Sequence, residues 1–584
     1  MDENLYEMTS DTPIKNASDM QLGSQSSNLQ KPMFACIFLL MCSVVLSLVF
    51  LRSGFASNGS DMIGYFVTLN LFVAQDTWAG PAIAVALGIS WFWAARAPAF
   101  KLKASGSAII GIALAAAASS VLLRFVAFEN YGMSLDEYLP TFQAEIFRGG
   151  NLMASMSDAN FAILDNLQPF FIYSDEAHQL WAAHYRPVHA AIISLFPRGV
   201  DVALAHAFLT GITVLAMADI ARRLFPDRPG APLLAILLLV SSPQVLLTSA
   251  SGFAFTTHLA FNSVWLALFL RGTWRAHIAA AIVGFFALGI HQVHVHAIYV
   301  FPFGIAMLAG YFGSRWKSIP YVVAYAIGVP VWIMWPEIAT FIQTGDLDAL
   351  PRALLEVEYL ANYLNYSDEA GVLDRQFSFL FLAVNLWRFL LWLSPALVLL
   401  LVLSVYLARR LGSVAVICAI GFFFTVAVSH LMLSNQMHTI GSRYYHAAFA
   451  NVVVVALAAY YAYFDSRQLR SCVAALIIVG LVVFLPWRAY QMHEKIAPRA
   501  AIQAQLAALD ADRIVVRPGG TWFIADFVRN DPYMEKGPVY FLQRVEGPVP
   551  EFPGKTVTVT GADLIEMGLP RGTYLEPAFD LSIR

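Results

Sequence analysis

The chain has 584 residues, of which 58% are hydrophobic and only 13% charged, and its mean hydropathy is +0.62. This composition excludes an ordinary soluble protein and indicates a polytopic membrane protein. The net charge is −3, no basic tract is present and the four cysteines lie in apolar runs, so neither a nucleic-acid partner, a disulfide framework nor a Cys-x-x-Cys metal site is predicted.

Taken in order, the chain begins with a polar segment, residues 1–31, that is predicted to be a disordered cytoplasmic tail. About thirteen apolar runs follow, each close to the ~20 residues that a helix needs to cross the hydrocarbon core. They lie near 32–51, 79–95, 105–127, 199–220, 231–249, 253–270, 277–291, 293–311, 319–336, 378–407, 413–433, 443–463 and 471–487. The sequence therefore predicts an all-α polytopic membrane domain over residues 32–487.

Lysine and arginine are distributed unevenly between alternate loops. With a cytoplasmic N-terminus, the cytoplasmic loops carry Arg96, Lys101, Lys103, Arg222, Arg223, Arg228, Arg271, Arg275, Arg315, Lys317, Arg409, Arg410, Arg467 and Arg470. Such loops stay in the cytoplasm under the positive-inside rule. The long segments 128–198, 337–377 and 488–584 are then predicted to lie outside. We expect a multi-pass protein of the inner (plasma) membrane whose functional face is turned to the periplasm or exterior.

An acidic pair, Asp136 and Glu137, lies just beyond the apolar run 105–127, where the chain leaves the membrane on the predicted outer side. An amphipathic helix is predicted here, and Gly149-Gly150 is expected to end it. Adjacent helical residues diverge by about 100°, so one carboxylate can face a site while the other turns toward the scaffold. A solvated interfacial helix is the alternative interpretation.

Polar residues also gather at the predicted outer ends of several other helices. Ionisable side chains are costly at membrane depth and usually line a cavity or bind a ligand, although Tyr, His and Arg also serve as interfacial anchors. We expect them to share one outer cavity. The candidate substrate-binding residues are His184, Tyr185, Arg186, His258, His291, His294, Arg443, Tyr444 and Tyr445.

The histidines at 291, 294 and 296 do not have the spacing of a zinc site, and a structural or hydrogen-bonding role is the main interpretation. A divalent cation held by Glu137 and one of these histidines is left open as an alternative.

After residue 487 the chain changes character. Residues 488–510 have the pattern of an amphipathic helix, and 513–517 and 556–560 are predicted strands among Gly- and Pro-rich turns. Residues 488–584 are long enough for a small extracytoplasmic α/β domain. No catalytic constellation is found in it, so acceptor binding or a lid over the site is the hypothesis for its role.

Several short motifs resemble the membrane glycosyltransferases of the C-type fold (GT-C), which include the dolichyl-phosphate-mannose protein mannosyltransferases and the bacterial lipid A aminoarabinose transferase. The motifs are the acidic pair followed by QAEIFRGG (143–150), HYRPVHAAIISLF (184–196), the stretch 241–271, GSRYYHAAFANVVVVALAAYY (441–461) and VRNDP (528–532). The resemblance extends over most of residues 105–545. The chain departs from the family pattern at His291-Gln292, which replaces the usual Arg-Pro, and in two extra spans that precede the helix that normally comes first.

The resemblance implies an enzyme that transfers a sugar, with inversion, from a polyprenyl-phosphate donor to a glycan, lipid or protein acceptor at the outer membrane face. A lipid phosphate is already a good leaving group, and the sequence has no nucleotide-binding glycine motif. The reaction needs a base for the acceptor hydroxyl, for which Asp136 is the candidate, while Glu137 orients the acceptor or binds a cation. Arg186 and Arg443 are the candidates for the donor phosphate, because guanidinium groups bind phosphate oxygens in pairs.

A transporter or flippase of a lipid-linked intermediate is the alternative function, and a non-catalytic assembly factor is a third. The sequence shows no internal repeat and no broken helices at matched positions of two halves, which are typical of transporters. An acidic pair outside the membrane rather than at its midplane also favours chemistry over translocation.

Overall fold

The computed structural model describes residues 29–52, 71–97, 105–167, 170–349, 379–408, 411–432, 440–464, 466–517, 524–543 and 554–570. The predicted tail, apart from its last residues, lies outside this set. So do residues 350–377 of the predicted outer loop, the Arg409-Arg410 pair and residues 571–584.

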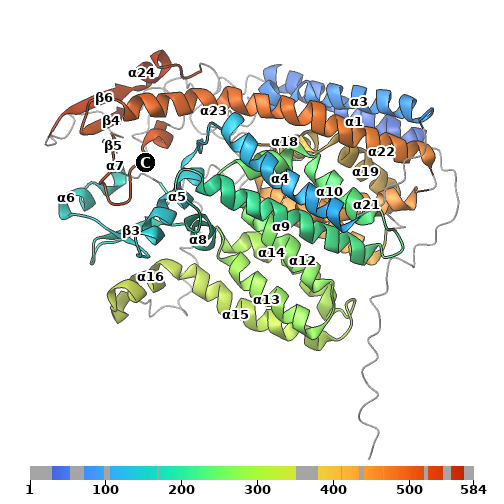
Figure 1. Cartoon of the computed structure of the whole chain (residues 1–584), viewed down its shortest axis with the longest axis horizontal. Helices are drawn as coiled ribbons and strands as arrows, with labels where there is room; N and C mark the ends of the chain where they lie inside the picture. The colour runs from blue at the N-terminus through green and yellow to red at the C-terminus, as the bar shows by residue number, and fades with distance from the viewer. Residues whose placement is uncertain are drawn as a thin grey trace, which may run out of the picture.

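Apolar helices form the larger part of the molecule, which is a multi-pass membrane protein (Figure 1). Seven helical stretches in the described part of the chain are long and apolar enough to cross a membrane. They are Gln30–Val49, Phe72–Ala94, Gly106–Val126, Asp201–Leu224, Ser413–Leu431, Arg443–Ala462 and Arg467–Ala507. Two pairs of helices bent by 61° and 72° raise the number to nine if each pair is one span.

The count of about thirteen spans is not confirmed. The predicted spans near 277–291 and 293–311 are shorter helices, and the run 378–407 divides into two at Ser394-Pro395. The run 231–249 bends at Ser242-Pro243. Both breaks come at a residue followed by proline, because proline disfavours the helical conformation of the residue before it.

The helices outside the segment 128–198 and before the C-terminal sheet follow one another along the chain. They are α1 (Gln30–Arg52), η2 (Phe72–Asp76), α3 (Ala79–Ala94), α4 (Gly106–Val126), α9 (Asp201–Leu224), α10 (Ala231–Val240), α11 (Pro243–Ala250), α12 (Phe255–Phe269), α13 (Trp274–Leu288), α14 (Val293–Leu308), η3 (Arg315–Ser318), α15 (Ile319–Ile333), α16 (Trp335–Thr344), η4 (Leu347–Ala349), α18 (Phe379–Trp392), α19 (Pro395–Tyr406), α20 (Ser413–Met432), η6 (Arg443–Ala448), α21 (Phe449–Ala462), α22 (Arg467–Val479), η7 (Gly480–Phe484) and α23 (Leu485–Ala507). Helix α9 packs against both α4 and α12, and α13 packs against α12 and α15.

The arginine- and lysine-rich loops meet one another, as the charge asymmetry predicts for loops on one side of a membrane. Arg271, after α12, lies 3.3 Å from the carboxylate of Asp219 near the end of α9. Lys317 donates a hydrogen bond of 2.7 Å to the backbone oxygen of Gly272. The loops after α9, α12 and α14 therefore form one surface.

The segment between α21 and α22 contacts two of these loops, the one after α9 and the one after α3. The guanidinium of Arg228 lies 4.9 Å from the ring centre of Phe464. Arg467, at the start of α22, donates to the backbone oxygen of Ala97 after α3. Five of the six predicted cytoplasmic loops are thus joined in pairs or groups, and the sixth, at 409–410, is not described.

The predicted outer segment after α4 folds into short helices and a small sheet. Its elements are α5 (Leu135–Arg148), β1 (Ala154–Ser155), α6 (Asp158–Phe161), α7 (Leu164–Leu167), β2 (Ile172–Asp175), β3 (Leu180–Ala183) and α8 (Val188–Ser194). The three strands are antiparallel in the order β1-β3-β2. The helix predicted to end at Gly149-Gly150 is present as α5 and has Gly149 as its C-terminal cap.

The C-terminal region forms a second sheet, of three parallel strands in the order β5-β4-β6. Its elements are β4 (Arg513–Arg517), η8 (Ile524–Phe527), β5 (Val539–Leu542), β6 (Thr556–Thr560) and α24 (Gly561–Glu566). The two strands predicted from sequence are confirmed with the same bounds. Figure 1 shows α23, in orange, running from the helix bundle to this sheet, so the domain boundary predicted at residue 488 falls within a continuous helix.

A buried carboxylate, Asp76 at the end of η2, joins three distant segments of the bundle. Its Oδ1 accepts hydrogen bonds from Trp392 at 2.9 Å and from Arg488 at 2.8 Å. Arg388 lies 3.3 Å from Oδ2. Asp76 and Arg488 are both 0% exposed. We call Asp76, Arg388, Trp392 and Arg488 the Asp76 network.

Candidate active site

The acidic pair lies in the first turn of α5, at the point predicted from sequence. Ser134 and Glu137 have the spacing of a capping box, but the Ser134 side chain makes no capping hydrogen bond. Glu137 instead accepts the backbone N–H of Met133 at 2.9 Å and that of Gly252 at 2.8 Å. One acidic side chain therefore fixes the start of α5 against the loop between α11 and α12.

Glu137 is 3% exposed, and burial raises the pKa of its carboxyl group, although the N–H of Gly252 opposes this. A Cβ atom on Gly252 would lie 2.9 Å from the Cβ of Glu137, so the backbone approaches closely only because this residue is glycine. The environment of Glu137 is that of a structural carboxylate.

Asp136 faces a different environment from that of its neighbour. Its Oδ1 accepts a hydrogen bond from the hydroxyl of Tyr185, which follows β3. Its Oδ2 accepts one of 2.7 Å from Nη1 of Arg443, at the start of η6. Segments 49 and 307 positions away in sequence thus meet at one carboxylate. The side chain of Asp136 keeps 13% exposure.

Aromatic rings surround this carboxylate and its partners. The rings of Tyr185 and His291 lie 4.1 Å apart between centres. The guanidinium of Arg443 lies 5.2 Å from the ring centre of Phe253 and 5.3 Å from that of Tyr444. Burial, and next the negative charge of Asp136, raise the pKa of Tyr185 well above its ordinary value, so its hydroxyl remains a hydrogen-bond donor.

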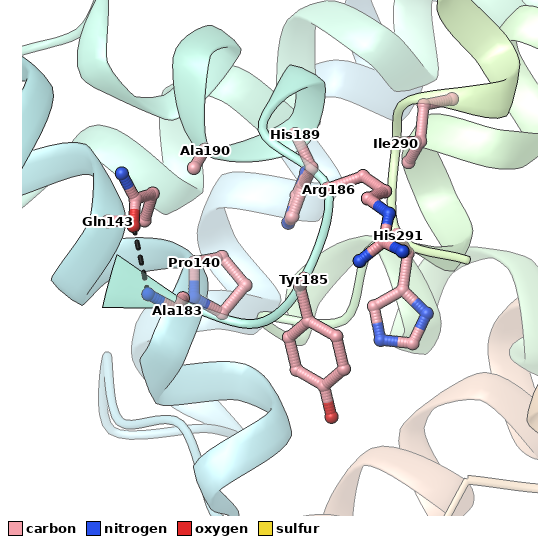
Figure 2. Close-up of a pocket in the computed structure, with 9 residues that line it drawn as sticks. All are labelled: Pro140, Gln143, Ala183, Tyr185, Arg186, His189, Ala190, Ile290 and His291. Atoms are coloured by element: carbon pink, nitrogen blue, oxygen red, sulfur yellow. Dashed lines mark hydrogen bonds between the residues drawn. The ribbon is translucent and has the colours of Figure 1, made fainter. Parts of the chain in front are cut away.

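Tyr185 also lines a small pocket (Figure 2). The pocket is lined by Pro140, Gln143, Ala183, Tyr185, Arg186, His189, Ala190, Ile290 and His291. Pro140 and Gln143 lie four and seven residues after Asp136, so the three positions share one face of α5. Gln143 accepts the N–H of Ala183 at 3.0 Å, as the dashed line in Figure 2 marks.

Arg186 lies beside His291 in this pocket and ties three backbone segments together (Figure 2). Its guanidinium donates to the backbone oxygens of His184 at 2.8 Å and Ile333 at 3.2 Å. Its backbone N–H donates to the backbone oxygen of His291 at 3.3 Å. Burial, and next the charge of Arg186, lower the pKa of His184 to about 3, which keeps that ring neutral.

Two further candidates lie deeper beneath this group. His258 on α12 is 0% exposed, and its ring centre lies 6.5 Å from that of Phe255. Within the described residues, neither ring nitrogen of His258 has a hydrogen-bond partner. His294 on α14 interacts electrostatically with Arg186 and His258. The structure thus brings all the predicted binding residues but one into a single neighbourhood.

Tyr445 is the exception. Its ring packs against Phe389 and Phe422 in the hydrophobic core, with centres 5.8 Å and 6.2 Å away. Arg443, Tyr444 and Tyr445 are adjacent in sequence and were all predicted to face the site. In the 3₁₀-helix η6, however, successive side chains diverge by about 120°. Arg443 and Tyr444 therefore face Asp136 while Tyr445 turns into the core.

The alternative of a cation held by Glu137 and a histidine does not fit the arrangement. Both oxygens of Glu137 accept backbone N–H groups, whose positive ends point at the atoms a cation would need. Among the described residues, no group of three or more His, Cys, Asp or Glu side chains could hold a metal ion.

Sequence reasoning missed several residues of the neighbourhood. Phe253 lies under the guanidinium of Arg443, and Phe255 packs edge-on against Tyr444. His189 shares a hydrogen bond of 2.8 Å with Thr257. Gln143 also belongs to it, because it lines the pocket and is only 3% exposed. The available signal was the spacing of Gln143 from Asp136, which places both on one helix face.

Comparisons with known proteins gave matches among solved structures alone. No protein-family model and no curated protein matches the chain. Similar structures include ArnT from Cupriavidus metallidurans bound to undecaprenyl phosphate, with 16% identity over 74% of this chain and 86% of that one, at a TM-score of 0.38. The apo state of the same protein matches with 14% identity over 74% and 85% of the chains, at a TM-score of 0.35.

An oligosaccharyltransferase from Archaeoglobus fulgidus, in complex with Zn and sulfate, also matches. Its identity is 14%, over 74% of this chain and 62% of that chain, with a TM-score of 0.41. The chain therefore spans less than two thirds of this relative. These structures are glycosyltransferases of the C-type fold, the fold that the sequence motifs resemble.

Proposed function

We propose that the protein is a glycosyltransferase that moves a sugar from a polyprenyl-phosphate donor to an acceptor hydroxyl or amide at the outer face of the membrane. The observation that carries this proposal is the contact of Asp136 with Tyr185 and Arg443. A partly exposed carboxylate, an arginine and two tyrosines meet beside buried nitrogens of His258 and His291 that have no hydrogen-bond partner within the described residues. That combination suits the deprotonation of an acceptor and the departure of a phosphate.

Asp136 is the proposed base. Its carboxylate takes the proton of the acceptor as the acceptor oxygen or nitrogen forms a bond to C1 of the sugar. The bond from C1 to the phosphate oxygen breaks on the opposite side, and the phosphate leaves with the electron pair, so the configuration at C1 inverts. Tyr185, as a hydrogen-bond donor to Asp136, orients the carboxylate for this step.

Arg443 is the proposed phosphate ligand. It holds Asp136 through Nη1 at 2.7 Å, while its buried Nε has no hydrogen-bond partner among the described residues. A donor phosphate that binds this guanidinium draws positive charge away from Asp136, and the carboxylate becomes a stronger base as a result. Arg186 acts differently in this proposal, because it donates to the backbone oxygens of His184 and Ile333 and shapes the pocket wall.

The sugar is proposed to lie over Tyr444 and beside His258 and His291. The ring centres of Tyr444 and Phe255 lie 5.0 Å apart. Together the two rings form an apolar surface against which a sugar ring can stack. His258 has two partnerless nitrogens and His291 has one, Nδ1, among the described residues. Buried groups of this kind are stabilised when a ligand supplies their hydrogen bonds.

The placement in the membrane is part of the proposal. The arginine- and lysine-rich loops define a cytoplasmic face, and Asp136 lies in the segment predicted to be outside. Residues 1–31 are then a cytoplasmic tail, 32–487 a transmembrane catalytic domain, and 488–584 an extracytoplasmic C-terminal domain. The expected location is the inner (plasma) membrane, with the site open to the periplasm or exterior.

Sugar transfer by purified protein in liposomes tests the proposal. A polyprenyl-phosphate sugar labelled in the sugar is the probe, and membranes of the source cell supply acceptors. Asp136→Asn keeps the shape of the side chain but cannot take a proton, so transfer should fall by roughly 10²–10⁴-fold. Wild-type turnover in this variant would assign the base to another group. Translocation of the labelled lipid without transfer by the wild type would support a flippase instead.

A further inference from the structure

The catalytic helix α5 begins without a side-chain cap of its own. Ser134 is its N-cap residue and makes no capping hydrogen bond. The exposed N–H groups of a first helical turn need acceptors from elsewhere. The N–H of Leu135 donates instead to Oδ1 of Asp526, at 2.9 Å, from 391 positions further along the chain. The cap of α5 is therefore provided by the C-terminal region.

Asp526 is itself held in place by a second helix. Its Oδ2 lies 3.4 Å from Nη1 of Arg499 on α23, and the same Nη1 lies 3.4 Å from the backbone oxygen of Met133. Arg499 is 1% exposed and Asp526 is 6% exposed. The carboxylate thus links the start of α5 to the helix that continues from the membrane part.

The residues that follow Asp526 hold the chain on either side of the acidic pair. Arg529 donates to the backbone oxygen of Gly132, and its guanidinium lies 4.0 Å from the ring centre of Tyr131. The hydroxyl of Tyr138 donates to the backbone oxygen of Asn530 at 2.5 Å. Positions before and after Asp136 are both fixed by one short segment.

The same segment also holds the strand that leads to the hydrogen-bond partner of Asp136. Trp181 on β3 donates through its ring N–H to the backbone oxygen of Pro532 at 2.9 Å. Tyr185 is the second residue after the end of this strand. Residues 524–533 therefore contact the supports of both the carboxylate and the tyrosine. We call this segment the C-terminal clamp.

We propose that the C-terminal clamp is a positioning element for sugar transfer, in which the Asp526 carboxylate caps α5 and keeps Asp136 within reach of Tyr185 and Arg443. Asp136 is the second residue of α5, so fraying of the first turn moves it directly. This inference rests on the proposed function for its catalytic consequence, while the cap itself can be measured without any reaction.

Hydrogen exchange of the purified full-length protein measures the cap. Loss of a capping carboxylate in Asp526→Ala should speed exchange of the Leu135 amide and its neighbours by about 5- to 30-fold. Asp526→Asn keeps an acceptor oxygen and should speed the exchange of the Leu135 amide by less. The matched control is Asp563→Ala, because Asp563 accepts from Thr560 in a capping box of α24 in the same region. That variant should leave exchange at residues 132–138 unchanged.

A pH series separates the cap from simple packing. Burial raises the pKa of Asp526 to about 6, against the charges of Arg499 on α23 and Arg529, while Asp136 on α5 adds to the increase and Tyr131 lies nearby. Because this pKa lies above that of a solvated carboxyl, the closed state binds the proton more tightly than the opened one, and Leu135 should gain protection as the pH falls from 7 to 5, after correction for intrinsic exchange. In Asp526→Asn this dependence should be absent.

Transfer kinetics with the labelled polyprenyl-phosphate sugar complete the test. Asp526→Ala should lower kcat by about 10- to 100-fold, because a small displacement of a reacting group has an effect of that size. The KM for the donor should change by less than about twofold, since no donor contact is removed. Asp526→Asn should restore part of kcat, and Asp563→Ala should match the wild type.

Each result has one interpretation. Unchanged exchange at Leu135 in Asp526→Ala would overturn the clamp whatever the enzyme does. Faster exchange with unchanged kcat would refute its role in the reaction. A wild type that transfers no sugar, although its Leu135 amide depends on Asp526 and on pH as expected, would refute the proposed function and leave the cap established.

Discussion

Asp136 and Asp76 are two carboxylates that have the same kinds of partners. Each is contacted by an arginine and by the polar hydrogen of an aromatic side chain, Tyr185 for Asp136 and Trp392 for Asp76. They differ in their exposure to solvent and in the arginines that contact them. Asp76 is 0% exposed and lies between two arginines, whereas the side chain of Asp136 is 13% exposed and has one.

The difference shows that an ion pair by itself does not mark a site. In the Asp76 network, Arg488 donates to Asp76, to Gln491 and to two backbone oxygens, so its charge is used within the protein. Among the described residues, buried nitrogens without a hydrogen-bond partner occur in both groups, Nε of Arg443 beside Asp136 and Nε of Arg488 beside Asp76. The access of solvent to the Asp136 carboxylate, which Asp76 lacks, is what distinguishes the candidate site from the structural network.

The strongest way to break this comparison is to remove the charge of Asp76. Asp76→Asn removes the carboxylate charge that Arg388 and Arg488 contact, and loss of one partner of a buried pair typically costs about 3–5 kcal/mol. We expect a lower yield of folded protein and a thermal unfolding temperature well below that of the wild type in detergent. Asp136→Asn serves as the control and should unfold close to the wild type. An Asp76→Asn protein that unfolds normally but transfers no sugar would reverse the two roles.

A smaller effect is expected when Arg443 is changed to lysine. The charge remains, but the planar pair of donors that grips phosphate oxygens is lost. Binding of a fluorescent polyprenyl phosphate should weaken by about 10- to 100-fold, the equivalent of about 1.5–3 kcal/mol for hydrogen bonds to a charged group. Arg388→Lys, in the Asp76 network, is the matched control, and its folded fraction should bind the lipid normally. Equal binding by both variants would separate Arg443 from the donor phosphate.

The smallest effect sharpens the comparison within the acidic pair itself. Because burial raises the pKa of Glu137 above its ordinary value of 4.5, the folded state binds its proton more tightly than the unfolded state. Its contribution to stability is therefore fully present below pH 4.5 and is lost as the pH rises through the raised pKa. Glu137→Gln should make the unfolding temperature less dependent on pH, with an accompanying loss of about 1 kcal/mol for one hydrogen bond. Parallel pH curves for the two proteins would contradict this assignment.

Much of the candidate site was predictable because each part carries a local signal. Asp136, His291 and Arg443 are polar residues at the ends of apolar runs, and topology alone places such ends on one side of a membrane. The strands 513–517 and 556–560 alternate or concentrate β-branched residues between turn signals, and they appear with the same bounds.

The remainder depended on contacts that no local pattern encodes. The bonds from Asp76 to Arg488 and from Asp526 to Leu135 join residues 412 and 391 positions apart. Their only sequence trace is a charged residue within or beside an apolar run, which does not identify the partner. Tyr445 points away because it comes two residues after Arg443, which is about 200–240° around a helical turn of either kind.

The two arginines that contact Asp76 and Asp526 lie on a single stripe of helix α23. Its buried residues are Arg488, Met492, Ile496, Arg499, Ile502 and Leu506, which recur at intervals of three or four. Arg488 reaches Asp76 in the bundle and Arg499 reaches Asp526 in the clamp, and a separation of eleven residues is about three turns, or roughly 16 Å of helix. The helix thus fixes the distance between the Asp76 network and the C-terminal clamp. Insertion of a single residue would rotate one arginine by about 100° away from its carboxylate. Evolution can therefore lengthen this spacer by whole turns far more easily than by single residues.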